Sequence, residues 1–112
     1  SFVDRKKYLI KSGGENVYPA EIEQVILADP RVVDAVVVRK TDDKWGEIPV
    51  AFVVRKSDAL SEDALIELCK RHIAGYKVPK EVRFVSEDFL PRSTTGKIKR
   101  FDLEKIIESE LN

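Results

Sequence analysis

Hydrophobic and polar residues follow one another along the chain with spacings that change from segment to segment and so predict its elements. The first helical spacing places Ile22, Val25 and Ile26 on one face. Pro19 suits the first position of such a helix, because the N–H that proline lacks would have no partner there. Asp29-Pro30 ends the pattern, since a proline disfavours helical geometry in the residue before it. We therefore predict a helix between these two prolines.

Runs of β-branched and apolar residues predict the strands. Residues 32–38 are almost wholly apolar, which indicates a strand buried on much of both faces. Residues 50–54 are its expected neighbour, and the polar residues 39–49 are expected to connect the two. Residues 82–84 alternate with polar positions and predict a third strand.

A second helix is predicted to begin after Ser61, a good N-cap that is followed by acidic residues. We expect Gly75 to end this helix. One side of it carries Leu65, Leu68, Cys69 and His72. We interpret His72 as a half-buried packing residue, because no acidic or nucleophilic partner is placed near it in the sequence.

The two ends of the chain complete the predicted fold. Residues 8–10 and 17–18 are expected as short strands around the glycine-rich turn 12–16. A final amphipathic helix is expected to carry Leu103, Ile106, Ile107 and Leu111. The order of elements predicts an α+β domain with a small central β-sheet flanked by helices, plus a short N-terminal two-stranded hairpin.

Composition narrows the class of protein. The 112 residues suffice for one domain, and 43% hydrophobic with 36% charged residues are typical of a globular chain. No apolar run approaches the roughly 20 residues of a transmembrane segment, and no signal peptide is visible. The single cysteine, Cys69, excludes an internal disulfide and fits a cytoplasmic location. One cysteine and one histidine argue against a metal site.

The net charge is zero, but positive charge is concentrated in two windows. Residues 1–11 hold four basic side chains and one acidic, and residues 92–100 hold four basic and none acidic. The other residues hold twelve basic and nineteen acidic side chains. This distribution favours a small polyanionic ligand over a nucleic acid, which needs a broad basic face.

The window 92–100 is the strongest candidate site. Gly96 allows the backbone to approach a ligand closely, and Lys97 supplies a mobile charge for a phosphate or carboxylate. It is not a Walker A loop, because Pro91 stands where the first glycine is required and Ile98 replaces the Ser/Thr. On these residues alone, a solvated basic loop before a helix is as good an interpretation.

Three further segments admit a functional and a structural interpretation. Gly13 and Gly14 can direct backbone amides toward a ligand or simply form a tight turn. Trp45 can stack on an adenine or anchor its loop to the sheet. Tyr76 and Lys80 suit a phosphorylated ligand and equally an ordinary connection between a helix and a strand.

Taken in order, these segments resemble the C-terminal domain of adenylate-forming enzymes of the AMP-binding family, specifically fatty-acid and aryl-acid acyl-CoA synthetases. Five motifs in register make the resemblance highly specific, and they cover nearly the whole chain. They are DRKK at 4–7, SGGENVYPAEIE at 12–23, KWGE at 44–47, GYKVPK at 75–80 and LPRSTTGKI at 90–98.

The resemblance implies a ligase that works in two steps. A carboxylate first attacks the α-phosphate of ATP, giving an acyl-adenylate and pyrophosphate. The thiol of coenzyme A then displaces AMP to form a thioester. The resemblance also implies a partner outside this sequence, an N-terminal domain that binds the small carboxylic acid and ATP with most of the Mg²⁺ contacts. The domain in hand would swing between two orientations, and alone it is expected to be inactive.

Residue roles carry over by position. Lys97 matches the catalytic lysine of adenylation and would contact ATP or AMP. Residues 1–7 match the hinge segment, with Asp4, Arg5 and Lys7 at the junction and Arg5 also near the nucleotide; residues 8–112 match the mobile domain. The residues that match coenzyme A contacts are Gly13, Gly14, Glu15, Trp45, Tyr76 and Lys80.

Several readings of the whole protein stay open at this point. A ligase for long- or medium-chain fatty acids is the leading one. An aryl-acid CoA ligase and a free-standing, non-catalytic binding module of the same fold are the alternatives. The sequence begins with Ser1 rather than methionine, and Phe2-Val3 resembles the end of an extended segment, so we expect a piece of a longer protein.

Overall fold

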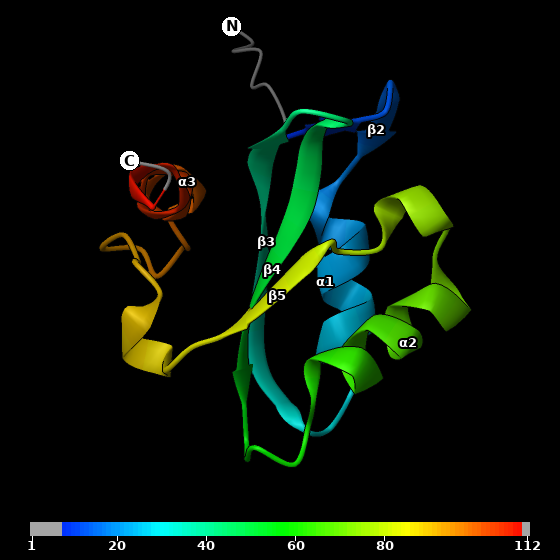
Figure 1. Cartoon of the computed structure of the whole chain (residues 1–112). Coiled ribbons are helices and arrows are strands. Elements are labelled where there is room, and N and C mark those ends of the chain that lie inside the picture. Colours follow the sequence, from blue (N-terminus) through cyan, green and yellow to red (C-terminus); the bar gives the residue numbers. More distant parts are fainter. Residues whose placement is uncertain (1–7, 111–112) are drawn as a thin grey trace, which may run out of the picture.

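The computed structural model describes residues 8–110, which form a five-stranded sheet with helices on both of its faces (Figure 1). The predicted α+β class, with its short N-terminal strand pair, is confirmed. In chain order the elements are β1 (Ile10–Ser12), β2 (Glu15–Val17), α1 (Pro19–Leu27), β3 (Val32–Asp42), β4 (Gly46–Arg55), α2 (Glu62–His72), the 3₁₀ turn η1 (Gly75–Lys77), β5 (Glu81–Phe84), the 3₁₀ turn η2 (Glu87–Phe89) and α3 (Arg100–Ser109).

Strand β4 is the central strand of the sheet, because three other strands pair with it. It pairs antiparallel with β3 along nearly its whole length and parallel with β5. β1 meets the same strand where Ser12 lies opposite Gly46, and β2 pairs with β1. The predicted pairing of residues 32–38 with residues 50–54 and the predicted third strand are confirmed.

The connection between β3 and β4 is shorter than predicted. The expectation of a loop over residues 39–49 is wrong, because β3 continues to Asp42 and β4 begins at Gly46. The Asp42 carboxylate closes the turn by accepting hydrogen bonds from the N–H groups of Lys44 (3.0 Å) and Trp45 (2.8 Å). Polar residues fit in this part of β3 because it is an edge strand whose side chains reach solvent.

The side chains of β3 and β4 alternate between two separate cores. Val37 and Val53 belong to the core beneath α1 and α2, whereas Val36 and Phe52 belong to the core beneath α3. Figure 1 shows α1 and α2 on one side of the sheet and α3 on the other. The prediction that residues 32–38 form a strand buried on much of both faces is therefore confirmed.

A β-bulge at Val33 decides which face the start of β3 presents. The pairing register shifts between Val32 and Asp34, and Val33 is 45% exposed. Because of this extra residue, Val32 and Ala35 lie in the same core despite being three positions apart. Asp34 lies after the bulge and two positions before Val36, so it faces the same side of the sheet as Val36, the side of α3.

Side chains cover the free edge of β3. Three of its outward N–H groups donate to neighbouring oxygens, and these bonds also tie α1 and the N-terminal segment to the strand. They are Ala35 N to Asp34 Oδ1 (2.8 Å), Val37 N to Glu23 Oε2 (2.8 Å) and Arg39 N to Tyr8 Oη (2.9 Å). An edge bonded in this way is a poor template for pairing with another strand.

Helix α2 begins where predicted and ends earlier. The Ser61 hydroxyl accepts a hydrogen bond from Ala64 N (3.1 Å), which confirms the N-cap. The prediction that Gly75 ends this helix is wrong: Ile73 is already extended, and Gly75 begins the 3₁₀ turn η1. Ile73 turns away because its side chain packs against the core beneath α1 and α2.

The two unusual side chains of α2 differ in environment. His72 is exposed, so the expectation of a half-buried position is wrong; it lies in the last turn, where Nδ1 hydrogen-bonds the carbonyl of Leu68 (2.9 Å). Cys69 is fully buried, and burial raises the pKa of its thiol to about 11. It is a core residue.

The ends of the described chain also refine the predictions. The two short strands cover residues 10–12 and 15–17 rather than 8–10 and 17–18, because the turn holds only Gly13 and Gly14 and leaves Ser12 to pair with Glu15. In α3, Leu103 and Ile107 are buried as predicted, whereas residue 111 lies outside the described range. None of the helices within residues 8–110 has the length and apolar character needed to cross a membrane.

Candidate functional site

The segment with the densest positive charge forms a small hairpin between η2 and α3. Arg92 and Ile98 form an antiparallel bridge, and Lys99 N donates to Pro91 O (2.9 Å). At the tip, Ser93 N donates to Lys97 O (2.8 Å). Gly96 has a φ of +87°, which a glycine adopts without strain. We call residues 91–99 the lysine hairpin.

Lys97 differs from its basic neighbours in having no carboxylate partner within residues 8–110. The other three basic residues of the window 92–100 form ion pairs, at 2.5 Å, 3.5 Å and 2.9 Å: Arg92 with Asp34, Lys99 with Asp102, and Arg100 with Glu23. Lys97 is exposed at the hairpin. Its charge is therefore available to a ligand, as the sequence-based hypothesis requires.

A shallow pocket lies beside Lys97, between α1, β3 and the start of α3. Its volume is about 320 Å³. Its lining combines two basic residues and one carboxylate with apolar side chains: Glu23, Ala35, Val36, Lys97, Ile98 and Arg100. This is a place where an anionic group could meet Lys97 next to the edge of the sheet.

The glycine-rich turn and Trp45 form a second candidate site. Gly13 N donates to the carbonyl of Trp45 (2.8 Å), and Gly13 has a φ of +58°. A Cβ at this position would lie 3.0 Å from Trp45 Cε3. Gly14 has a φ of +85° but open space around it. Residue 13 thus favours glycine because of its positive φ and its contact with Trp45, and residue 14 favours glycine because of its positive φ alone.

The indole of Trp45 is neither fully packed nor free. It rests against Gly13 and remains 38% exposed. Two ammonium groups lie over its ring, Lys44 Nζ at 5.0 Å and Lys80 Nζ at 4.9 Å from the centroid. An aromatic face bordered by two cations suits a planar base that carries phosphates. The interpretation of Trp45 as an anchor of its loop is confirmed in part, and its stacking on a ligand stays a prediction.

Tyr76 and Glu15 lie farther out on the same part of the molecule. Tyr76 is 39% exposed on η1, which lies close to β2. The neighbouring Lys77 is held by Glu21 of α1 at 2.9 Å, and this hydrogen bond raises the pKa of the lysine. Glu15 is exposed in β2. The structure therefore brings Gly13, Trp45 and Lys80 together, with Tyr76 and Glu15 nearby.

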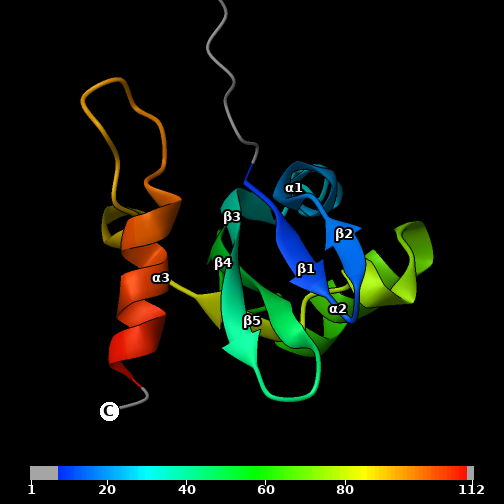
Figure 2. The ribbon, with the colours of Figure 1, turned by 90° about the horizontal axis from the view of Figure 1, so that it is seen from above.

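The two candidate sites lie at opposite ends of the domain. The lysine hairpin forms an ion pair with Asp34, near the start of β3, whereas Trp45 lies in the turn after Asp42, the last residue of that strand. Eight residues of strand correspond to about 26 Å at a rise of about 3.3 Å per residue. Figure 2 shows the hairpin, in orange, projecting away from the β1–β2 and β3–β4 turns.

The proposed hinge residues Asp4, Arg5 and Lys7 lie outside residues 8–110, the part of the chain that the structure describes. The same range contains no group of three or more His, Cys, Asp or Glu residues that could hold a metal ion.

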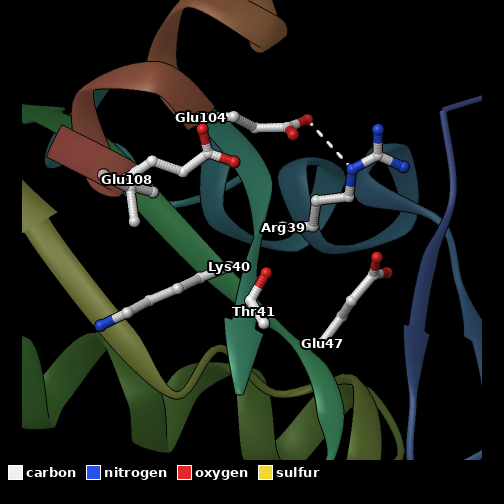
Figure 3. Close-up of a pocket in the computed structure, with 7 residues that line it drawn as sticks. Arg39, Lys40, Thr41, Glu47, Glu104 and Glu108 are labelled. Carbon is white, nitrogen blue, oxygen red and sulfur yellow. Dashed lines mark ion pairs between the residues drawn. The ribbon is translucent and has the colours of Figure 1, made fainter. Parts of the chain in front are cut away.

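One polar cluster was missed by the sequence analysis. It borders a pocket of about 360 Å³ between the end of β3 and α3 (Figure 3). Arg39 Nε pairs with Glu104 at 3.1 Å, and the Tyr8 hydroxyl donates to the same carboxylate. Burial, together with the bond to Glu104, raises the pKa of Tyr8. Tyr8 and Glu104 are 96 positions apart, so no local motif could reveal them.

Comparison with known proteins places this geometry in a family. The family described as "AMP-binding enzyme C-terminal domain" matches residues 21–97. A 2-succinylbenzoate–CoA ligase of Bacillus cereus (strain ATCC 10987 / NRS 248) is 50% identical over 106 residues, which are 95% of this chain and 21% of that protein.

Two solved structures show the same fold. The fatty acyl CoA synthetase of Mycobacterium tuberculosis superposes with a TM-score of 0.87 at 45% identity, covering 96% of this chain and 21% of that one. ATP-bound MatB from Rhodopseudomonas palustris gives 0.86 at 36% identity, covering 95% and 21%. The chain thus spans about a fifth of the length of these relatives. It belongs to the AMP-binding enzyme C-terminal domain family, the C-terminal domain of adenylate-forming acid–CoA ligases.

Proposed function

We propose that residues 8–112 are the mobile C-terminal domain of an AMP-forming acid–CoA ligase, connected by the hinge segment 1–7 to an N-terminal domain. The whole protein would join a carboxylate to ATP, releasing pyrophosphate, and then transfer the acyl group to the thiol of coenzyme A, releasing AMP. The observation that carries this proposal is Lys97, an exposed cation without a carboxylate partner among residues 8–110, at the tip of a well-bonded hairpin.

Lys97 has a clear physical task in the first step. An anionic carboxylate must approach an anionic triphosphate, and negative charge shifts onto the phosphate oxygens as the new bond forms. A cation that contacts both reactants lowers their repulsion and stabilises that charge. A lysine suits this task because its charge sits on a flexible stem that can reach into a site on another domain.

The Gly13–Trp45 site is proposed to serve the second step. Gly13, Gly14 and Glu15 would line the path of the pantetheine arm, which needs a thin channel without large side chains. The exposed face of Trp45 and the ammonium group of Lys80 would contact the nucleotide end of coenzyme A. Tyr76, also exposed nearby, is a further proposed contact.

The acid is proposed from the relatives rather than from this domain, because the proposed N-terminal domain would bind it. The relatives bear the names of 2-succinylbenzoate and fatty acyl ligases. These names support the aryl-acid alternative at least as well as a long- or medium-chain fatty acid. A panel of aryl and fatty acids, assayed for acyl-CoA with the whole protein, would separate them.

A substitution of Lys97 tests the proposal. In the whole protein, Lys97→Ala should lower acid-dependent exchange of pyrophosphate into ATP by about a hundredfold or more, because one charge that stabilises the transition state is lost. Formation of the thioester from supplied acyl-adenylate should stay within a few-fold of the parent. Lys105→Ala, an exposed lysine of α3, is the matched control. Near-normal exchange in Lys97→Ala would refute the role of this residue.

A further inference from the structure

Both ends of the lysine hairpin are fastened to the body of the domain by guanidinium–carboxylate pairs. Arg92, at the start of the hairpin, pairs with Asp34 of β3 at 2.5 Å. Arg100, immediately after the hairpin, pairs with Glu23 of α1 at 2.9 Å. Lys97 lies between these two attachments.

The Arg92 guanidinium holds the tip of the hairpin as well as its base. One nitrogen of the guanidinium donates to Asp34 Oδ2, and the other donates to the carbonyl of Gly96 (3.1 Å), the residue before Lys97. A planar guanidinium with several donors can hold two acceptors at once in fixed directions, which a lysine cannot do. The backbone next to Lys97 is thereby held to β3.

The regular alternation of β3 after the bulge supplies Asp34 for this contact. Asp34 lies two positions before Val36 and opposite Val54, which both belong to the core beneath α3, so its side chain shares their face of the sheet. Asp34 therefore lies on the face of α3, where it meets Arg92 of the hairpin. Its second oxygen, Oδ1, accepts a hydrogen bond from Ala35 N (2.8 Å), which fixes the carboxylate.

The ion pair between Arg100 and Glu23 spans the free edge of β3 and connects α3 to α1. The two terminal nitrogens of Arg100 donate to the two oxygens of Glu23, at 2.9 Å and 3.3 Å, so the contact is bidentate. Glu23 Oε2 also accepts from Val37 N (2.8 Å). The Glu23 side chain is 14% exposed and is thus held in one place by β3 and by α3.

We infer that Asp34, Arg92, Glu23 and Arg100 are positioning residues for Lys97. This inference rests on the proposed function, because it assigns them the task of holding the lysine in register with a site on another domain. A misplacement of about 1 Å can cost a reaction up to a hundredfold in rate. The pairs are partly exposed, so their main effect should be on placement and not on stability.

The test uses the whole protein with Asp34→Asn and Glu23→Gln. Each variant should lower the kcat of pyrophosphate exchange at least tenfold, while thioester formation from supplied acyl-adenylate changes less than threefold and the melting temperature by no more than a few degrees. Asp34→Glu keeps the carboxylate and should restore most of the exchange rate. Arg92→Ala combined with Asp34→Ala should lose no more than Arg92→Ala alone, since the two residues act as one pair.

Glu110→Gln is the matched control, because it breaks an ion pair with Arg83 (2.7 Å) away from the hairpin and should leave both steps unchanged. Exchange rates that stay near normal in Asp34→Asn and Glu23→Gln, while Lys97→Ala abolishes exchange, would overturn this inference and leave the proposed function standing. Equal losses in both steps with a lowered melting temperature would also overturn it. Normal exchange in Lys97→Ala would remove the proposed function itself.

Discussion

At the scale of single residues, the two candidate sites depend on backbone conformations that glycine adopts without strain. Gly13, Gly14 and Gly96 all have positive φ values, and each sits in a turn that carries a proposed ligand contact. A side chain at such a position costs about 1–2 kcal/mol in the backbone alone. The glycines therefore belong to the sites even though they carry no functional group.

Gly13→Ala tests this requirement. Its Cβ would face both the unfavourable φ and the 3.0 Å contact with Trp45, so we expect the free energy of unfolding to fall by about 1–2 kcal/mol or more. Gly75→Ala is the control, because Gly75 lacks a positive φ and has open space around it. Urea unfolding of both variants measures the difference. Equal stability of the two would contradict the account of Gly13.

Individual residues also show what a sequence can reveal about a site. Lys97 and the turn glycines were found because their chemistry is local: a lysine beside a glycine, or two glycines between short strands. Asp34 and Glu23 could not be found in this way. Their partners Arg92 and Arg100 lie 58 and 77 positions away, so only the fold brings the charges together.

At the scale of elements, β3 is the strand that organises the domain. Its two faces fill two cores, its bulge directs Val32 into the core beneath α1 and α2, and its free edge binds α1 and Tyr8. Alternation and apolar content predicted its burial. The end of the strand was misjudged because polar residues in an edge strand resemble a loop, and only the pairing with β4 distinguishes the two.

Tyr8→Phe tests the attachment at this edge. The change removes the acceptor for Arg39 N and the donor to Glu104, and leaves both groups partly buried. We expect the free energy of unfolding to fall by about 1–3 kcal/mol. Tyr76→Phe alters an exposed hydroxyl and should change stability by less than about 0.5 kcal/mol. Chemical denaturation of both variants decides the point, and a Tyr8→Phe protein as stable as the parent would rule out this role.

At the scale of the whole molecule, the separation of the two sites is the central feature. The lysine hairpin and the Gly13–Trp45 site lie at opposite ends of β3, about 26 Å apart by strand length. One small reacting centre cannot contact both at once. A domain that serves two steps would therefore have to turn between them, which agrees with the proposed hinge before Tyr8.

The most direct test compares both half-reactions in two variants of the whole protein, Lys97→Ala and Gly14→Leu. We predict a crossed pattern. Lys97→Ala should lose pyrophosphate exchange and keep thioester formation from acyl-adenylate, whereas Gly14→Leu should keep exchange and lose thioester formation. Equal losses of both activities in either variant would contradict the assignment of one step to each end of the domain.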